Sequence, residues 1–547
     1  MKNNAILFYF ISYLFWKCTT PPALPAWVPY DETEELAQNA SNKNKRLQYK
    51  RLQSQHTDKN HWFVPFTKEL ANFNSRYEEL KPHIVERSIP ELQAAVANET
   101  FTYEELTLFY LYRIYRFETD STLYLNAIIS LNPTVLAEAR EKDKHPEKRA
   151  QKTLYGMPIL LKDNINTVGM PTTAGAAVFK NNRTETDAYI VKQLKAQGAL
   201  ILGKLNLSEW AYYFCEGCPL GYSALGGQTL NPYGRKRFES GGSSSGSGVA
   251  AAANYAVATI GTETSGSILS PAAKNALVGL KPTIGAVSRS GIIPISSTFD
   301  TAGPMTKNVI DNLLIYNALI GYDSKDQYSY AAAPLNPAHL DTASLKGKRF
   351  GLLDTDAQDT LLQQAVQEIQ KAGGKVVEVT LPDLDIDMFV KILDTDMKVD
   401  LPRYIETYGN ESLTVKKISD VIAFNNQAPE KYAPYGQEIF ENIAQDTTDY
   451  NAFQFKKASF RAALTKELDA LMDRHQLDAL ITLDYFTSSY LATAHYSAIG
   501  IPIGFYSNGE PQNMSLIARG KQEQLLIELA AAYEKMAAHR KPPELYP

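Results

Sequence analysis

A stretch of small residues at positions 241–283 constrains this chain more than any other part of the sequence. It reads GGSSSGSGVAAAANYAVATIGTETSGSILSPAAKNALVGLKPT and contains two clusters rich in glycine and serine, at 241–248 and 261–267. Between the clusters, residues 249–260 are mostly small and apolar and carry no charge. This layout predicts two backbone loops that are held against each other by a buried helix and strand.

The first cluster has two general interpretations besides a catalytic one, a flexible Gly/Ser linker and a phosphate-binding loop. A linker is not expected to run directly into an uncharged buried segment and a second glycine turn. A phosphate-binding loop requires lysine after its glycines, and positions 246–248 read Gly-Ser-Gly. Because glycines let the chain adopt positive φ and approach a ligand closely, and the serines among them place hydroxyl groups there, the pattern favours a setting for a serine nucleophile.

This segment resembles the signature of the amidase signature family of serine hydrolases, and its continuation to residue 305 most resembles the peptide amidase branch. The family uses a triad of serine, cis-serine and lysine. The resemblance places the nucleophile at Ser267, the middle serine at Ser243 and the lysine at Lys162. It implies that Ser267 attacks an amide carbonyl, that Ser243 relays the proton, and that neutral Lys162 accepts it.

The lysine lies in the motif GMPILLKDN at 156–164, at the end of an apolar run that predicts a buried strand. Lysine is rarely buried unless it is paired. Two roles are therefore open for Lys162: a structural lysine paired with Asp163, or a base whose pKa is lowered because burial disfavours the charged ammonium. The residues alone leave both open, and the family motif favours the base.

The resemblance also implies roles for residues around the triad. Backbone N–H groups of the second glycine turn are expected to stabilise the oxyanion, from Thr264, Ser265, Gly266 and Ser267. Three side chains are expected to support the triad from behind: Asp163, Thr262 and Asp300. Three residues are expected to line the substrate site: Asn206, Gly227 and Gln228. The family chemistry implies neither a metal nor a cofactor.

Histidine and cysteine chemistry offers weaker alternatives. The chain has 8 histidines, and none lies in the nucleophile-elbow context of a Ser-His-Asp triad. His495 is expected to be structural or to line the substrate site. Because the chain has only 3 cysteines, a cysteine-rich zinc site is not expected. Cys215 and Cys218 are expected to form a local disulfide in an oxidising compartment, the alternative being two free thiols.

Residues 1–18 have the features of a signal peptide or lipoprotein-type leader. Lys2 precedes an apolar run, AILFYFISYLFW, that is too short to span a bilayer comfortably. Cys18 stands where a bacterial lipoprotein is cut and acylated, although residues 15–17 are not the small residues that such a site prefers. We predict that the protein is exported and is periplasmic or lies on the outer surface. In one version of this prediction, a lipid attached to Cys18 anchors the protein. The alternative is a cytosolic chain with an incidental apolar start.

The rest of the chain predicts one domain. Residues 19–75 are polar and predict a tether or poorly packed extension, with the aromatic residues at 62, 63 and 66 as candidates for docking. No repeat or clear linker interrupts the chain after residue 84, although its 547 residues are enough for several domains. Residues 76–547 are therefore expected to form one α/β domain with a mixed, twisted central β-sheet flanked by helices, as in the family.

The function that follows is hydrolysis of a carboxamide bond of a small or peptidic substrate through an acyl-enzyme, with release of ammonia or an amine. One alternative is an amidotransferase subunit that makes ammonia from glutamine for tRNA-bound substrates. Another is a non-catalytic amide-binding surface protein. The net charge of −5 does not indicate a nucleic-acid partner. The expected partner is an amide substrate, with membrane attachment only through the N terminus.

Overall fold

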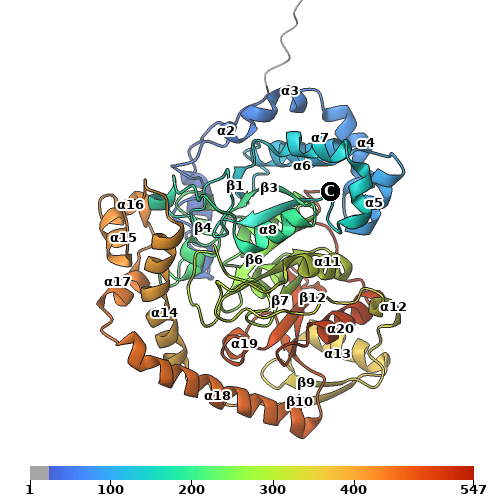
Figure 1. Cartoon of the computed structure of the whole chain (residues 1–547), viewed down its shortest axis with the longest axis vertical. Helices are drawn as coiled ribbons and strands as arrows, with labels where there is room; N and C mark the ends of the chain where they lie inside the picture. The colour runs from blue at the N-terminus through green and yellow to red at the C-terminus, as the bar shows by residue number, and fades with distance from the viewer. Residues whose placement is uncertain (1–23) are drawn as a thin grey trace, which may run out of the picture.

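The computed structural model describes residues 24–547, so the leader predicted at residues 1–18, including Cys18, lies outside the described residues. A mixed β-sheet of 11 strands forms the centre of the molecule, and helices flank it (Figure 1). This confirms the predicted α/β fold with a single large domain. Within residues 24–547, no helix is long and apolar enough to cross a membrane.

The strands of the central sheet come from most of the length of the chain. Their bounds are β1 (Ile128–Leu131), β2 (Pro158–Lys162), β3 (Leu200–Leu205), β6 (Ala258–Glu263), β7 (Val278–Lys281), β8 (Thr301–Thr306), β9 (Arg349–Leu353), β10 (Lys375–Val379), β11 (Ala479–Leu483), β12 (Ser497–Phe505) and β13 (Pro511–Ala518). Across the sheet they follow the order β1-β3-β2-β6-β8-β7-β12-β13-β11-β9-β10. A separate ribbon pairs β4 (Tyr222–Ser223) with β5 (Gly227–Gln228).

Strand β2 positions the predicted catalytic lysine. It lies between β3 and β6 and runs parallel to both, with Leu161 opposite Ile260 of β6. Strand β8 runs antiparallel to β6 on the other side. Because parallel strands end at the same edge of a sheet, Lys162 at the end of β2 lies beside the end of β6, where the second glycine turn begins.

The α-helices are α1 (Thr33–Asn39), α2 (Asn60–Phe63), α3 (Thr67–Leu70), α4 (Asn74–Ile84), α5 (Ile89–Ala97), α6 (Tyr103–Glu118), α7 (Val135–Asp143), α8 (Tyr189–Ala196), α9 (Ser245–Ala252), α10 (Leu269–Lys274), α11 (Val309–Leu319), α12 (His339–Thr342), α13 (Thr360–Lys371), α14 (Ile386–Tyr408), α15 (Ile418–Asn425), α16 (Pro429–Tyr432), α17 (Glu438–Gln445), α18 (Tyr450–His475), α19 (Ser488–Ala494) and α20 (Glu523–Met536). Short 3₁₀ turns are η1 (Lys45–Leu47), η2 (Val64–Phe66), η3 (Pro146–Gln151), η4 (Ala177–Phe179) and η5 (Glu209–Tyr212).

Local sequence signals explain where several of these elements begin. Ser88 forms a capping box with Glu91 at the start of α5. The helix and strand expected between the two glycine clusters are α9 and β6, and every residue of both is buried. Strand β9, helix α13 and strand β10 form a βαβ unit, in which β10 runs parallel beside β9.

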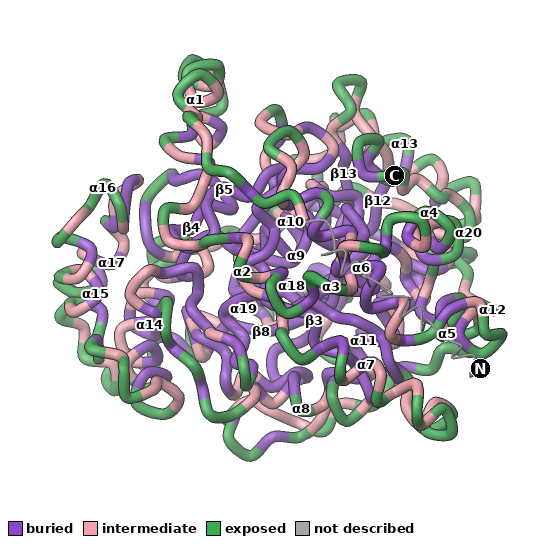
Figure 2. The backbone as a smooth tube through the Cα atoms, turned by 90° about the horizontal axis from the view of Figure 1, so that it is seen from above, coloured by how far each residue is buried: buried purple, intermediate pink, exposed green. Residues whose placement is uncertain are grey.

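The helices α14 to α17 gather at one side of the sheet, on the left of Figure 1. Viewed from above, buried backbone is concentrated around α9 and α10, while α15 to α17 form a more exposed rim (Figure 2). An aromatic cluster joins this rim to the central domain, since Trp210 contacts both Phe179 and Phe440. The rim therefore covers the loops that follow β2 and β3.

The segment 24–75 is not the tether that its composition predicts. Leu52, Phe63 and Phe66 are buried in the main core, so the docking expected for two of the aromatic residues is found. The Leu52 carbonyl oxygen accepts the backbone N–H of Gln228, at 2.8 Å. Two residues earlier in the chain, the Lys50 backbone N–H donates to the hydroxyl group of Tyr435, at 2.7 Å. Although the apolar residues of this segment are sparse, several of them reach the core, and the average polarity of the segment conceals this.

Candidate active site

Lys162 and Ser243 meet in the interior at the end of β2. The Lys162 Nζ atom lies 2.7 Å from Ser243 Oγ, 2.9 Å from Thr262 Oγ1 and 3.2 Å from the Thr262 carbonyl oxygen. Both the lysine and the serine side chains are buried. As an ammonium group, Lys162 donates to all three oxygens. Without its extra proton, its lone pair accepts the Ser243 hydroxyl group while its two N–H groups donate to Thr262, so an uncharged lysine can make all three contacts.

The electrostatics of the site also favour an uncharged lysine. Burial lowers the pKa of Lys162 to about 7, although the carboxylates of Asp300 and Glu263 act in the opposite direction. An ordinary lysine has a pKa of about 10.4. At neutral pH a large fraction of Lys162 is therefore available as a base.

Asp163 does not pair with Lys162, which was the structural alternative for that lysine. Its Oδ1 atom lies 3.2 Å from Nζ of Lys204, and both side chains are fully buried. Its Oδ2 atom accepts the hydroxyl group of Thr173. Asp163 therefore fixes the loop after β2 through Lys204, and no carboxylate among residues 24–547 is in hydrogen-bond contact with Lys162.

The two glycine clusters are held together through the residue that follows Ser243. The Ser244 backbone N–H donates to the Ser267 carbonyl oxygen at 3.2 Å, and Ser244 Oγ donates to the Thr262 carbonyl oxygen at 3.0 Å. The peptide bond between Gly242 and Ser243 is cis, as the family resemblance implies. The structure therefore brings Lys162, Ser243 and the loop that carries Ser267 to one place.

The turn that contains Ser267 connects β6 to α10. Gly266 has φ +83°, and a Cβ atom at this position would lie 2.7 Å from the Tyr485 ring, so glycine is required. The Glu263 carboxylate accepts the N–H groups of Ile268 and Leu269, at 2.7 and 3.0 Å. By contrast, within residues 24–547 none of the backbone N–H groups from Thr264 to Ser267 donates to a protein acceptor. These four donors are available to a ligand.

Asp300 supports the same turn from behind. One carboxylate oxygen accepts the Thr264 hydroxyl group at 2.5 Å, and the other accepts the backbone N–H groups of Ile295 and Ser296 at 2.9 and 3.0 Å. Burial raises the pKa of Asp300 to about 6, although these hydrogen bonds act against the shift. Thr262 orients Lys162 directly. Both residues therefore contact the catalytic segments as the sequence predicts.

A cavity of about 510 Å³ opens beside these residues. Its buried end is formed by Asn164, Thr262, Thr264 and Asp300. Its outer end is formed by exposed residues of two other segments: Lys325, Gln327, Arg403 and Thr407. The wall between them includes Ile292 to Ile295 and Tyr404. The cavity therefore leads from the surface to Thr262, which contacts Lys162, and to Thr264 of the second glycine turn. Lys162, Ser243 and Ser267 lie next to these residues in the chain or in contact with them, but are not themselves among the lining residues of the cavity.

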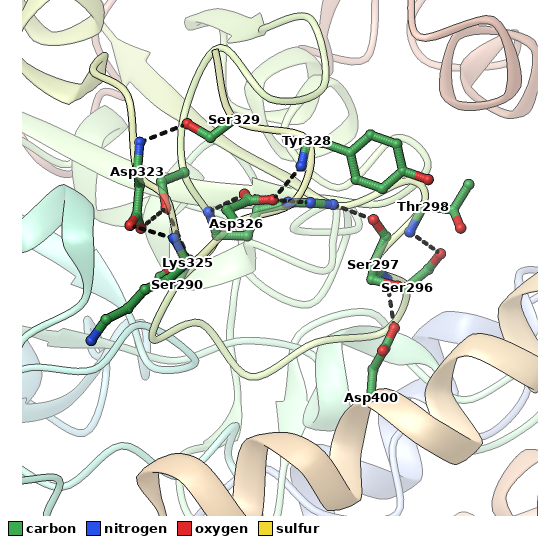
Figure 3. A network of polar contacts seen from close by, with 12 residues as sticks. Ser290, Ser296, Ser297, Thr298, Asp323, Lys325, Asp326, Tyr328, Ser329 and Asp400 are labelled. Carbon is green, nitrogen blue, oxygen red and sulfur yellow. Dashed lines mark hydrogen bonds and ion pairs between the residues drawn. The ribbon is translucent and has the colours of Figure 1, made fainter. Parts of the chain in front are cut away.

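A network of polar contacts holds the wall of the cavity (Figure 3). The Arg289 guanidinium pairs with both oxygens of Asp326, and the Ser297 backbone N–H donates to Asp400 of α14 at 2.7 Å. Sequence analysis missed this wall, because its residues come from separate loops and from a helix without a recognisable motif. The only local signal is the polar run Ser-Arg-Ser at 288–290.

The three residues expected to line the substrate site are not on the cavity. Asn206 is fully buried, and its side chain bonds the backbone of Asn126 and Gly227 and the hydroxyl groups of Thr229 and Ser223. Gln228 is buried and donates to two carbonyl oxygens. A Cβ atom at Gly227 would lie 2.4 Å from the Leu52 carbonyl oxygen. Most of the polar atoms of these residues are thus bound by the loops that they connect, although Gln228 Oε1 has no partner within residues 24–547.

The remaining predictions concern histidine and cysteine. Cys215 and Cys218 form the expected disulfide. His495 is half-buried, its ring packs edge-on against that of Tyr328, and it is not among the cavity residues. Burial lowers its pKa to about 2, so it stays neutral. The structural interpretation of His495 therefore holds.

A mixed sheet with a buried lysine, a cis-linked serine and a glycine turn of free backbone donors is the arrangement of an amide-hydrolysing serine enzyme. Comparison with known proteins agrees, since the Amidase family matches residues 105–483. The chain belongs to this family. A probable amidase from Arabidopsis thaliana is 35% identical over 483 residues, covering 84% of this chain and 92% of that protein.

Two further relatives differ in their described functions. The crystal structure of native peptide amidase from Stenotrophomonas maltophilia has 36% sequence identity and a TM-score of 0.78, and the match covers 84% of this chain and 99% of that one. A glutamyl-tRNA(Gln) amidotransferase subunit from Gloeobacter violaceus is 30% identical over 499 residues, covering 84% of this chain and 98% of that protein. The family thus includes more than one use of amide chemistry.

Proposed function

We propose that this protein hydrolyses the carboxamide bond of a linear small or peptidic amide through an acyl-enzyme on Ser267, releasing ammonia or an amine. The observation that carries the proposal is the 2.7 Å contact between Ser243 Oγ and the buried Lys162 Nζ, beside a turn with four free N–H donors. A peptide amidase of known structure with the same fold supports a peptidic substrate.

The proposed reaction proceeds in two halves. In the first, Ser267 Oγ attacks the amide carbonyl, its proton passes to Ser243, and the Ser243 proton passes to neutral Lys162. The carbonyl oxygen becomes an oxyanion, which the N–H groups of residues 264–267 stabilise. The protonated lysine returns the proton through Ser243 to the leaving nitrogen as the carbon–nitrogen bond breaks. In the second half, water attacks the ester by the same relay and frees the carboxylic acid and Ser267.

The pH dependence follows from the lysine. The reaction needs Lys162 without its proton, and burial lowers the pKa of Lys162 to about 7. We therefore expect kcat/KM for an uncharged amide to rise about tenfold per pH unit below that value and to level off above it. A profile of initial rates between about pH 5 and 9 checks this. A rate that falls with rising pH, or that still rises steeply above pH 9, would contradict the assignment.

The substrate class is tested by ammonia release from a panel of amides, including glutamine, simple aliphatic amides and C-terminally amidated dipeptides. Turnover of the amidated peptides supports the proposal. Turnover of glutamine alone would instead favour the second candidate, an amidotransferase-like function, which the similarity to the Gloeobacter violaceus protein suggests. If no amide is hydrolysed, the catalytic proposal is wrong and the amide-binding alternative moves ahead.

We also propose that the protein is exported. The basic and apolar start of the sequence supports a cleavable leader, and the disulfide between Cys215 and Cys218 suits an oxidising compartment. Intact-mass analysis of the native protein is expected to show loss of residues up to about position 17, consistent with a cleaved leader. An added diacylglyceryl mass at Cys18 would indicate the lipoprotein form. An unprocessed chain in the cytosol would refute export.

A further inference from the structure

The charged residues of the cavity differ in how well their charges are satisfied by the protein. Three carboxylates line it, and each is bound internally. Asp326 pairs with Arg289, and Asp300 accepts three hydrogen bonds from its own loops. Asp400 accepts the Ser297 backbone N–H at 2.7 Å. Groups of the protein therefore compensate the charges of these carboxylates, so that little negative charge acts on a ligand in the cavity.

Two cations at the outer end of the same cavity are not held in this way. Within residues 24–547, the Lys325 amino group has neither a hydrogen bond nor an ion pair, and its side chain extends away from the Arg289–Asp326 contacts (Figure 3). Arg403 has a single contact, 3.5 Å from Asp400 Oδ1, and its side chain is 61% exposed. A guanidinium group has five N–H donors, so most of those of Arg403 are free.

The partner of Arg403, Asp400, ionises less readily than an ordinary carboxylate. Burial raises the pKa of Asp400, and the neighbouring carboxylate of Asp396 acts in the same direction. The opposite end of the cavity lies at Thr262 and Thr264, beside the proposed catalytic groups, and its carboxylate, Asp300, is buried and hydrogen-bonded by the protein. The cavity therefore has an enclosed end whose carboxylate is bound by the protein and a solvated mouth that carries two cations.

The direction in which a substrate lies follows from the proposed chemistry, on which this inference rests. When a primary amide is hydrolysed, the leaving group is ammonia, so everything else in the substrate belongs to the acyl side and has to occupy the cavity. We infer that Lys325 and Arg403 bind a carboxylate on the acyl portion of the substrate, so that the enzyme prefers amides of acidic peptides or of other acids with a second carboxylate. The apolar wall at Ile292 to Ile295 contacts the carbon chain between the two ends.

The test compares peptide amides that differ in one charge. Acetylated tripeptide amides carry Glu, Gln or Lys at the first or second position, followed by the same amidated residue. For the wild type we expect kcat/KM for the better Glu peptide to exceed that of its Gln counterpart by about tenfold at low salt, and the Lys peptide to be poorer still. Raising the ionic strength is expected to reduce the ratio, because the mouth is exposed to solvent.

Variants assign the preference to the two cations. Lys325→Gln and Arg403→Gln are each expected to lower the Glu-to-Gln ratio about threefold, and the double variant to bring it close to one. Lys371→Gln removes an equal charge from exposed α13, away from the cavity, and is expected to keep the wild-type ratio. Equal rates for Glu and Gln peptides in the wild type, or a ratio that survives the double substitution, would overturn the inference.

A binding measurement separates this inference from the catalytic proposal. Calorimetry with the Ser267→Ala variant compares the dissociation constants of the Glu and Gln peptides without turnover. We expect tighter binding of the Glu peptide by a similar factor. Equal constants would overturn the inference even if the wild type hydrolyses both peptides. Conversely, a wild type that binds the Glu peptide more tightly than the Gln peptide but hydrolyses no peptide amide would refute the proposed function. It would still support the binding of a carboxylate by Lys325 and Arg403.

Discussion

Replacing Ser267 with alanine is expected to reduce amide hydrolysis by about 10⁴- to 10⁶-fold. The substitution removes the oxygen that forms the acyl-enzyme, so neither half of the reaction retains its covalent intermediate. The fold is expected to persist, because within the described residues the Ser267 hydroxyl group makes no hydrogen bond and the substitution removes a single oxygen atom. Ammonia release measured on the purified variant, together with its thermal unfolding midpoint, checks both statements.

Ser270→Ala provides a matched control, since it removes a hydroxyl group three residues further along the same segment. Ser270 is buried and its hydroxyl group has no partner within residues 24–547. This variant is expected to keep the wild-type rate within a few-fold, in line with a change away from the chemistry. Addition of hydroxylamine to the wild type is expected to give the hydroxamate of the acyl group. Full activity of Ser267→Ala would mean that the nucleophile lies elsewhere.

Replacing Lys162 with methionine is expected to lower kcat by about 10⁴-fold. Methionine has a similar length but no basic nitrogen, so Ser243 loses the group that takes its proton. The relay is then broken even though Ser267 and the four N–H donors remain. Rates with an uncharged amide at pH 8, where the wild-type lysine is mostly neutral, give the comparison directly. The steep rise with pH is also expected to disappear.

Lys281→Met distinguishes this effect from the general consequence of losing a buried lysine. Lys281 is also fully buried, and burial lowers its pKa to about 8, but its amino group donates to the Tyr496 carbonyl oxygen at 2.6 Å. We expect this substitution to lower the unfolding midpoint more than it lowers kcat, because an acceptor is left unpaired in the interior. A wild-type kcat in Lys162→Met at pH 8 would remove the lysine from the mechanism.

The parts of the molecule that sequence analysis predicted well are those with short-range signals. The glycine turns and the strand that ends at Lys162 each depend on residues that are close together in the chain. The backbone conformation of the second glycine turn could be predicted as well. Gly266 occupies a position with φ +83°, which only glycine adopts readily. The motif then places Ser243 beside Lys162, although the two residues lie on different elements.

The substrate cavity could not be predicted in the same way. Its wall combines residues from the loop at 289–297, the loop at 325–327 and α14, which tertiary packing brings together. Asn206 illustrates the converse error, since a polar residue in a loop near the motif was expected to face the substrate. In the folded chain its amide is saturated by neighbouring loops. Whether a polar group points into a cavity or completes a loop depends on contacts that sequence distance does not reveal.

The contacts of the segment 24–75 bear on the order in which parts of the molecule can fold. Leu52 meets Gln228 and Lys50 meets Tyr435, so the first described part of the chain finds its last partners only after most of the polypeptide is present. Contacts between residues so distant in sequence close large loops and form late in folding. These two contacts of the early segment must therefore stay unmade until the later residues have been synthesised. Export of an unfolded chain, which we propose above, would meet this requirement.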